Sequence, residues 1–257
     1  MDRLMIMTNP DMDPTERFTG RSSYYRHRPG YPDALFQYLL HRGVIWKGCT
    51  VADVGSGTGI FSRGLLDRGI TVHAVEPNRE MRECAEADLQ SRACFCSVAG
   101  RSEATTLATA SVDAVTVAQA FHWFDVDLTG IEFRRILRPG GQVCIVYNER
   151  DTSDPFSHEY EELVIAYTDL DKDSREKSRD PRPFFNRKCE EATFPNDQGL
   201  DYDGLIGRVF STSYMPKEGD EGYEAVRRRL SEMFARHQRN GRVFLRYNTR
   251  AYHGTLE

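Results

Sequence analysis

The spacing of apolar residues divides the first 150 residues into alternating short strands and helices. Short apolar runs that stop at polar or glycine-rich residues predict strands at 50–54, 71–75, 93–98, 112–118 and 142–147. Apolar residues at helical spacing predict helices near 33–40, 61–69, 80–89 and 128–137. This alternation with short connections is typical of an α/β fold, a doubly wound parallel sheet with helices on both faces.

The last hundred residues follow a different pattern. Residues 151–198 are highly charged, with a helix expected near 158–167, and residues 205–214 have the composition of a strand. An amphipathic helix is predicted at 221–237, and residues 243–252 again form a strand. The two late strands are expected to add an antiparallel edge to the sheet.

Composition limits the class of protein. The 257 residues carry 34 Lys and Arg against 39 Asp and Glu, a net charge of −5, and 39% are hydrophobic. That balance is globular, and its mild acidity argues against nucleic-acid binding. No targeting segment or transmembrane run is found, and the six cysteines lack zinc or disulfide spacing. We expect a cytoplasmic protein with reduced cysteines, without a metal and without membrane attachment.

The most informative segment follows the first predicted strand. Gly55, Gly57 and Gly59 separate a strand from a helix, and glycine lets the backbone turn sharply and approach a ligand. The spacing G-x-G-x-G differs from the dinucleotide fingerprint and from the phosphate loop of nucleotide hydrolases. Glu76 lies 17 residues after Gly59, at the end of the second strand, where a carboxylate can accept both hydroxyls of a ribose.

Several motifs together resemble those of class I S-adenosylmethionine-dependent methyltransferases. They are Asp53-x-Gly55-x-Gly57-x-Gly59, Glu76-Pro77, and Arg138-Pro139-Gly140-Gly141 before the fifth strand. The segments Tyr24 to Pro32 and Gln119 to Phe124 are similar to the small-molecule branch with trans-aconitate-type and ubiquinone-type methyltransferases. The resemblance covers residues 20–150 best. It implies a seven-stranded, Rossmann-like, mostly parallel sheet with an antiparallel C-terminal edge strand.

The resemblance also implies a division of the chain. Residues 1–20 would be a flexible N-terminus and 21–150 the core that binds S-adenosylmethionine. Residues 151–200 would form an insertion or lid, and 201–257 the strands and helix that complete the sheet.

The cofactor implied by the resemblance is S-adenosyl-L-methionine, with S-adenosyl-L-homocysteine as product. Its amino-acid end would contact Asp53, Gly55, Ser56, Gly57 and Gly59, with Arg28 on its carboxylate and Gln119 and Ala120 beneath it. Its ribose would bind Glu76, and its adenine would contact Pro77, Met81, Ser102 and Glu103.

The acceptor is expected beyond the fourth strand, under residues 20–32 and 150–200. His122 is the first candidate for general base, because a histidine pKa near neutrality suits proton removal. Tyr24 is a second catalytic candidate. Tyr24, Tyr31, Phe121, His122 and Trp123 would line the pocket, which suits a planar or apolar molecule. Arg182, Arg187 and Lys188 could instead receive a carboxylate, and the sequence does not choose between these pictures.

The expected activity is methyl transfer to an oxygen, nitrogen or sulfur atom of a small molecule. The protein would act as a monomer or homodimer without a nucleic-acid partner. Other readings are a nicotinamide-dependent oxidoreductase, an RNA or protein methyltransferase, and a cofactor-binding protein without catalysis.

Overall fold

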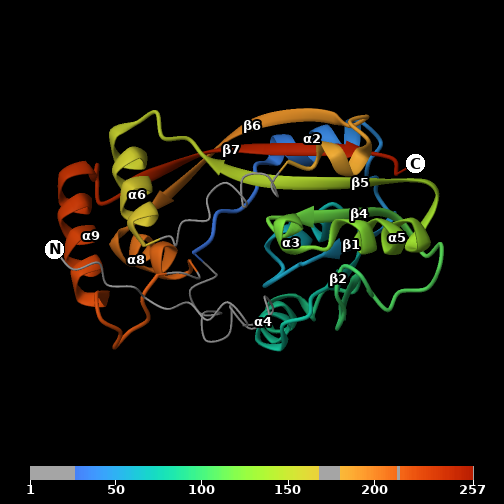
Figure 1. The fold of residues 1–257 in the computed structure, drawn as a ribbon, viewed down its shortest axis with the longest axis horizontal. Coiled ribbons are helices and arrows are strands. Elements are labelled where there is room, and N and C mark those ends of the chain that lie inside the picture. Colours follow the sequence, from blue (N-terminus) through green and yellow to red (C-terminus); the bar gives the residue numbers. More distant parts are fainter. Residues whose placement is uncertain (1–26, 168–179, 213–214, 257) are drawn as a thin grey trace.

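The computed structural model describes residues 27–167, 180–212 and 215–256. Seven strands form one sheet (Figure 1): β1 (Thr50–Val54), β2 (Thr71–Val75), β3 (Phe95–Val98), β4 (Val112–Ala118), β5 (Leu137–Arg150), β6 (Glu190–Leu200) and β7 (Val243–Gly254). The α-helices are α2 (Asp33–His41), α3 (Ile60–Leu66), α4 (Arg79–Leu89), α5 (Val126–Ile136), α6 (Pro155–Ala166), α8 (Tyr202–Phe210) and α9 (Tyr223–His237). Two short 3₁₀ turns are η1 (Phe121–Trp123) and η2 (Arg182–Phe185).

The strand order is β3-β2-β1-β4-β5-β7-β6. Strands β1 to β5 pair in parallel, whereas β7 pairs antiparallel with both β5 and β6. The predicted α/β class, with a mostly parallel seven-stranded sheet and an antiparallel C-terminal part, is confirmed. The strand order reverses between β1 and β4, which is where ligands bind to open α/β sheets.

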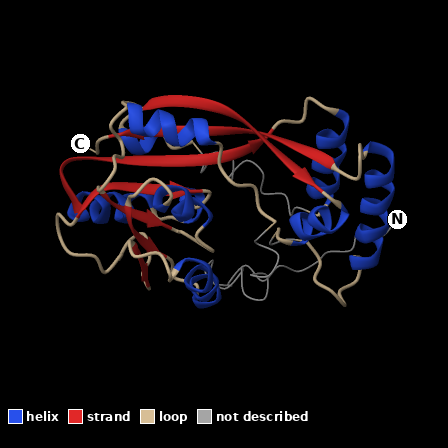
Figure 2. Cartoon of the chain, turned by 180° about the vertical axis from the view of Figure 1, so that it is seen from behind, coloured by secondary structure: helices blue, strands red, loops and turns tan. Residues whose placement is uncertain are grey.

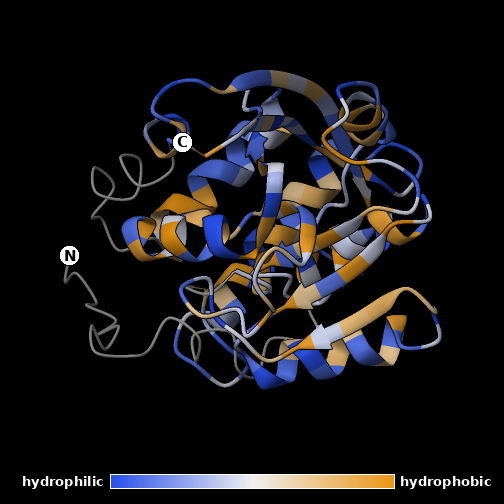
Figure 3. Ribbon diagram, turned by 90° about the vertical axis from the view of Figure 1, so that its right-hand side faces the viewer, coloured by the Kyte–Doolittle hydropathy of each residue, from blue (hydrophilic) through white to orange (hydrophobic). Residues whose placement is uncertain are grey.

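The period of two along the strands divides the core between the faces of the sheet. Val51, Val72 and Val146 pack with α2 and α3 on one face. Val54, Val115 and Ile145 pack with α5 and η2 on the other. Figure 3 shows the result, with mainly apolar strands and helices that carry both apolar and hydrophilic residues. Because both faces are covered, the carboxyl edge of the sheet is where a ligand can approach the strands.

A third apolar cluster lies where β6 ends and β7 begins. Helices α6, α8 and α9 pack around Leu200, Val243 and Leu245, at the far end of the β6–β7 ribbon. Figures 1 and 2 show this helical group beyond the carboxyl ends of β4 and β5. The helical group therefore faces the edge of the sheet at which the candidate site lies.

The strand predicted at 205–214 is wrong, because most of that segment belongs to α8. Asp201 caps the helix by accepting a hydrogen bond of 2.8 Å from the backbone N–H of Gly204. Leu205, Val209 and Phe210 then point into the third apolar cluster. The β-branched and aromatic residues of this segment suggested a strand, but burial on one helical face prevails over intrinsic propensity.

The missing strand is β6, which lies inside the segment assigned to an insertion or lid. Its residues are mostly polar and half exposed, and Pro195 interrupts the run. These features are acceptable because β6 is an edge strand that pairs only with β7. Its identity as a strand depends on a partner about 50 residues later in the chain, which no local pattern reveals.

Candidate functional site

The glycine loop after β1 has a backbone that other residues adopt only under strain. Gly55, Gly57 and Gly59 have φ values of +70°, +55° and +80°. A Cβ on Gly55 would lie 2.5 Å from the Cβ of Ala120, and a Cβ on Gly59 would lie 2.6 Å from Leu89. A Cβ on Gly57 would meet nothing within 4 Å. The first and third glycines are thus required by packing, whereas the middle one borders open space.

Glu76, at the end of β2, is tied to this loop. Its Oε2 accepts a hydrogen bond of 2.9 Å from the backbone N–H of Gly57, and its Oε1 accepts one of 2.9 Å from Asn78. The residue is 7% exposed. Burial raises the pKa of Glu76, while the two backbone donors and Arg82 oppose that rise. Each oxygen retains a lone pair for a further donor such as a ribose hydroxyl.

Asp53 is fully buried at the end of β1, with both carboxylate oxygens engaged. Ser62 Oγ donates to Oδ2 over 2.6 Å, and Thr116 Oγ1 donates to Oδ1 over 2.9 Å. Burial raises the pKa of Asp53 to about 6 despite these bonds. The carboxylate therefore joins β1, α3 and β4 behind the glycine loop, and the structure gives it this bracing function directly.

The turn after β4 is strained and lies against the glycine loop. Gln119 has a φ of +61°, a left-handed conformation that non-glycine residues seldom adopt. Its backbone N–H donates to Val146 over 2.9 Å, and its side-chain amide donates to the carbonyl of Asn148 over 3.2 Å. The next residue, Ala120, meets Gly55. Strain of this kind is concentrated at ligand sites, where the surroundings hold it in place.

His122 and Trp123 follow in η1 and are both half-buried. The His122 ring lies 4.8 Å from the Trp123 ring and 6.2 Å from the ring of Tyr147, measured between centroids. Phe121 instead points into the core, 5.0 Å from the ring of Phe184. Of the three aromatic residues predicted to line the pocket from this turn, two are in partly accessible positions.

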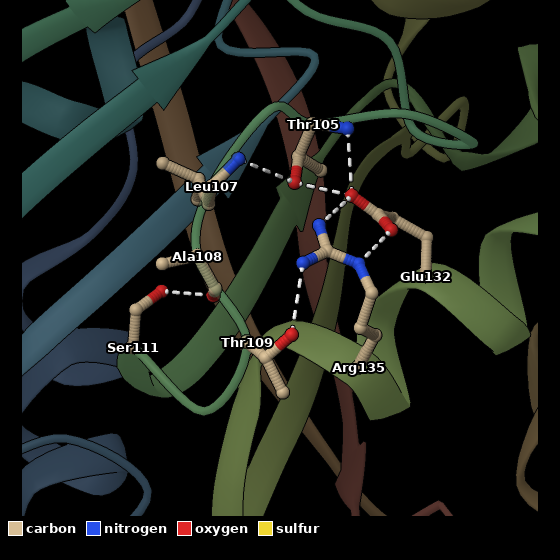
Figure 4. A network of polar contacts seen from close by, with 7 residues as sticks. All are labelled: Thr105, Leu107, Ala108, Thr109, Ser111, Glu132 and Arg135. Carbon is tan, nitrogen blue, oxygen red and sulfur yellow. Dashed lines mark hydrogen bonds and ion pairs between the residues drawn. The ribbon is translucent and has the colours of Figure 1, made fainter.

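The loop after β3 is held by a polar network on α5 (Figure 4). Glu132 Oε1 accepts hydrogen bonds from the backbone N–H and the hydroxyl of Thr105, over 2.8 and 2.6 Å. Arg135 donates to both oxygens of Glu132 over 2.7 Å. These bonds keep the pKa of Glu132 below its usual value against the effect of burial. In the same loop Ser102 is buried, and Glu103 accepts from the backbone N–H of Asp125 over 3.2 Å.

The segment before α2 crosses the strands of the carboxyl edge. The carbonyl of Gly30 accepts hydrogen bonds from Asn148 on β5 and Asn196 on β6, over 3.1 and 2.9 Å. Arg28 donates to the carbonyl of Ser211, at the end of α8, over 2.7 Å. Tyr31 packs edge-on against Phe61 at 4.9 Å. Burial and the charge of Asp53 raise the pKa of Tyr31, and Arg28 opposes them.

Tyr31 therefore lies against α3, the helix that follows the glycine loop, whereas the hydrogen bond of Arg28 goes to the helical group. Tyr24 lies outside the described residues. Two further predicted cofactor contacts lie at the start of α4. Pro77 is half-buried, and Met81 is buried. The side chain of Asn78 caps this helix by accepting a hydrogen bond from the backbone N–H of Met81. The basic residues that could instead receive a carboxylate, Arg182, Arg187 and Lys188, are exposed, and Arg182 forms an ion pair with Asp180.

Comparison with known proteins agrees with this geometry. Residues 52–145 match the family model described as a methyltransferase domain. An uncharacterized methyltransferase of Mycobacterium tuberculosis is 34% identical over 192 residues, which are 75% of this chain and 74% of the relative. The chain belongs to the class I S-adenosylmethionine-dependent methyltransferases.

More distant relatives extend the likeness to the whole chain. An uncharacterized methyltransferase-like protein of Schizosaccharomyces pombe is 27% identical over 255 residues and covers 93% of this methyltransferase and 94% of the relative. A solved structure from Anaeromyxobacter dehalogenans, named as a type II methyltransferase, has a TM-score of 0.66 at 24% identity. It covers 88% of this chain and 97% of that one, so the helical group belongs to a shared fold.

The methyl donor of this enzyme is S-adenosyl-L-methionine. The residues present fit it. The hydroxyl of Ser56 is buried in the glycine loop with no hydrogen-bond partner among the described residues, and Gly57 borders open space beside the Glu76 carboxylate.

Family membership also decides against a nicotinamide-dependent oxidoreductase. Within the described ranges no helix has the length and apolar character needed to cross a bilayer.

Sequence reasoning missed the residues that hold the site in place. Ser62, Thr116 and Glu132 support the loops through hydrogen bonds across 9 to 63 positions of the chain. Arg208 was also missed, although one signal was present. It is a charged residue on the otherwise apolar face formed by Leu205 and Val209.

Proposed function

We propose that this methyltransferase transfers a methyl group to an oxygen, nitrogen or sulfur atom of a small molecule. One observation supports this proposal above all: the glycine loop, Glu76 and the turn after β4 are in contact at the carboxyl ends of β1, β2 and β4. The helical group lies beyond this edge (Figure 1), on the side from which an acceptor would approach. The acidic net charge of −5 favours a small acceptor over a nucleic acid.

The predicted cofactor residues keep their proposed roles, with the exception of Asp53. Glu76 binds the ribose hydroxyls, and the glycine loop with Ser56 holds the amino-acid end, assisted by Arg28, Gln119 and Ala120. Pro77, Met81, Ser102 and Glu103 surround the adenine. Asp53 acts on the amino-acid end through the loop that it braces, since both of its oxygens are already bonded.

When bound, S-adenosylmethionine supplies an activated methyl group on a sulfonium, so the protein chiefly aligns the acceptor and excludes water. His122 is the proposed positioning group and general base, because it extends from the turn that touches Gly55 and is only half-buried. It would accept the proton of an acceptor hydroxyl, amine or thiol as the new bond forms. Trp123 and Tyr31 would bound the acceptor, and Tyr24 keeps its predicted place beside it.

The test uses tritiated S-adenosylmethionine and a metabolite extract separated by dialysis into small and macromolecular fractions. Label in the small-molecule fraction, lost with His122→Ala and partly kept with His122→Asn, supports the proposal. Label confined to the macromolecules would favour RNA or protein methylation. Once the acceptor is isolated, unchanged kcat and KM in His122→Ala would remove the role given to His122.

A further inference from the structure

Arg208 is a buried arginine that projects from α8 into the third apolar cluster. It is 3% exposed. Its Nε donates to the hydroxyl of Tyr247 over 3.1 Å, and its Nη1 reaches the hydroxyl of Thr212 at 3.5 Å. Its guanidinium carbon lies 5.9 Å from the ring centre of Tyr160. The fixed fork of an arginine offers five N–H donors, and these contacts use two of them.

The described part of the chain provides no carboxylate for Arg208. Glu161 follows Tyr160 on α6, but both of its oxygens are bonded to Arg150. Asp201 at the start of α8 caps the helix instead. Arg150 and Arg208 also share the ring of Tyr160, at 6.0 and 5.9 Å. A buried guanidinium cannot lose its proton, and without an anion it carries a desolvation cost of several kcal/mol.

The position of Arg208 connects it to the candidate site. Arg28 donates to the carbonyl of Ser211, one turn after Arg208 in the chain. The charges of Arg28 and Asp53 both act on Tyr31, whose ring packs on Phe61 in the first turn of α3, directly after the glycine loop. Tyr247, the partner of Arg208, pairs with Arg150 at the carboxyl end of β5. Arg208 therefore lies in the helical group, beside the end of β5 that extends past the carboxyl end of β4 toward that group.

We propose that Arg208 is the residue that binds the acceptor, through a carboxylate carried by that molecule. The inference rests on the proposed small-molecule function and narrows its substrate class. A planar carboxylate matches the guanidinium fork with two parallel N–H···O bonds. Tyr160 and Tyr247 supply an aromatic ring and a hydroxyl beside it. One unmatched positive charge suits a monoanion better than a phosphate dianion, since Glu161 already neutralises Arg150.

The test measures binding of benzoate and acetate to the enzyme saturated with S-adenosylhomocysteine, by calorimetry at constant ionic strength. Benzamide and acetamide are the neutral counterparts of equal shape. We expect at least one acid to bind at least tenfold more tightly than its amide, and Arg208→Gln to abolish that preference. Arg208→Lys should keep part of it, because it keeps the charge and loses the fork. Arg227→Gln, an exposed arginine of α9, is the matched control and should change nothing.

The outcomes separate this inference from the function on which it rests. Failure of the unaltered enzyme to bind S-adenosylhomocysteine would defeat the proposed function. Normal cofactor binding with no preference for either acid, or a preference that survives Arg208→Gln, would overturn only the role of Arg208. Arg208→Met provides a second readout, because an unmatched buried charge predicts a variant at least as stable as the parent. If none of these variants folds, Arg208 is structural and the inference is wrong.

Discussion

Gly57 and Glu76 are joined by a hydrogen bond of 2.9 Å from the backbone N–H of the glycine to Oε2 of the acid. This bond links the loop after β1 to the end of β2, so the two parts of the proposed cofactor site have one fixed geometry. The second oxygen accepts from Asn78, which caps α4. Glu76 thus orders the loop with the same carboxylate that we propose for the ribose.

Replacing Glu76 should therefore damage cofactor binding more than folding. We expect Glu76→Ala to weaken binding of S-adenosylhomocysteine by about 10- to 100-fold, since hydrogen bonds to a charged group contribute about 1.5–3 kcal/mol. Glu76→Gln should lie between the parent and Glu76→Ala. Calorimetric titration gives the affinity, with Glu83→Gln on the exposed face of α4 as control. Parent-like affinity in a folded Glu76→Ala protein would contradict the ribose role.

The glycines of the loop should differ in their tolerance of alanine. Gly55→Ala meets both a positive φ and a clash with Ala120, so we expect a loss of more than about 3 kcal/mol in the free energy of unfolding. Gly57→Ala has the backbone penalty alone, about 1–2 kcal/mol. Urea denaturation of the two variants side by side checks the order. Equal losses would mean that the loop relaxes away from Ala120.

Asp53 should make the protein less stable as the pH rises. Its pKa of about 6 in the folded protein lies above its ordinary value of 3.8, so the folded state holds the proton more tightly. Stability from this group is therefore present below pH 4 and is lost as the pH rises through 6. We expect the stability of Asp53→Asn relative to the parent to increase by about 2 kcal/mol between pH 4.5 and 7.

Urea denaturation across that pH range tests this prediction, and the other titrating groups cancel in the difference between the two proteins. Parallel stability curves would show that Asp53 keeps an ordinary pKa.

The network in Figure 4 should couple α5 to the loop that carries Ser102. Glu132→Ala leaves the N–H of Thr105 without an acceptor and Arg135 without its acid, so we expect a loss of about 2–4 kcal/mol in stability. Weaker binding of S-adenosylhomocysteine should accompany it. Thermal unfolding and calorimetry measure the two effects, with exposed Asp127→Asn in the same helix as control. A destabilised variant with unchanged cofactor affinity would separate this loop from the adenine site.

The sequence by itself determined the parallel half of the fold and the identity of the family. Apolar runs, glycine punctuation and helical periodicity are local properties, and they located β1, β2, β4 and α4 within a few residues. The motif around Gly55 and the acid at Glu76 also have fixed local consequences, since a turn with positive φ needs glycine. The prediction that Asp53 contacts the ligand also came from the local motif, which does not reveal the partners of its two carboxylate oxygens.

Only the tertiary structure decided the rest. Strand β6 exists because β7 pairs with it, and α8 is a helix because its apolar face is buried against α6 and α9. Asp53 is bonded to Ser62 and to Thr116, which is 63 positions away, and Arg208 is buried with no acid beside it in the described ranges. Burial and hydrogen-bond partners are set by contacts between distant segments, so the charge state and the task of these side chains follow from the folded chain.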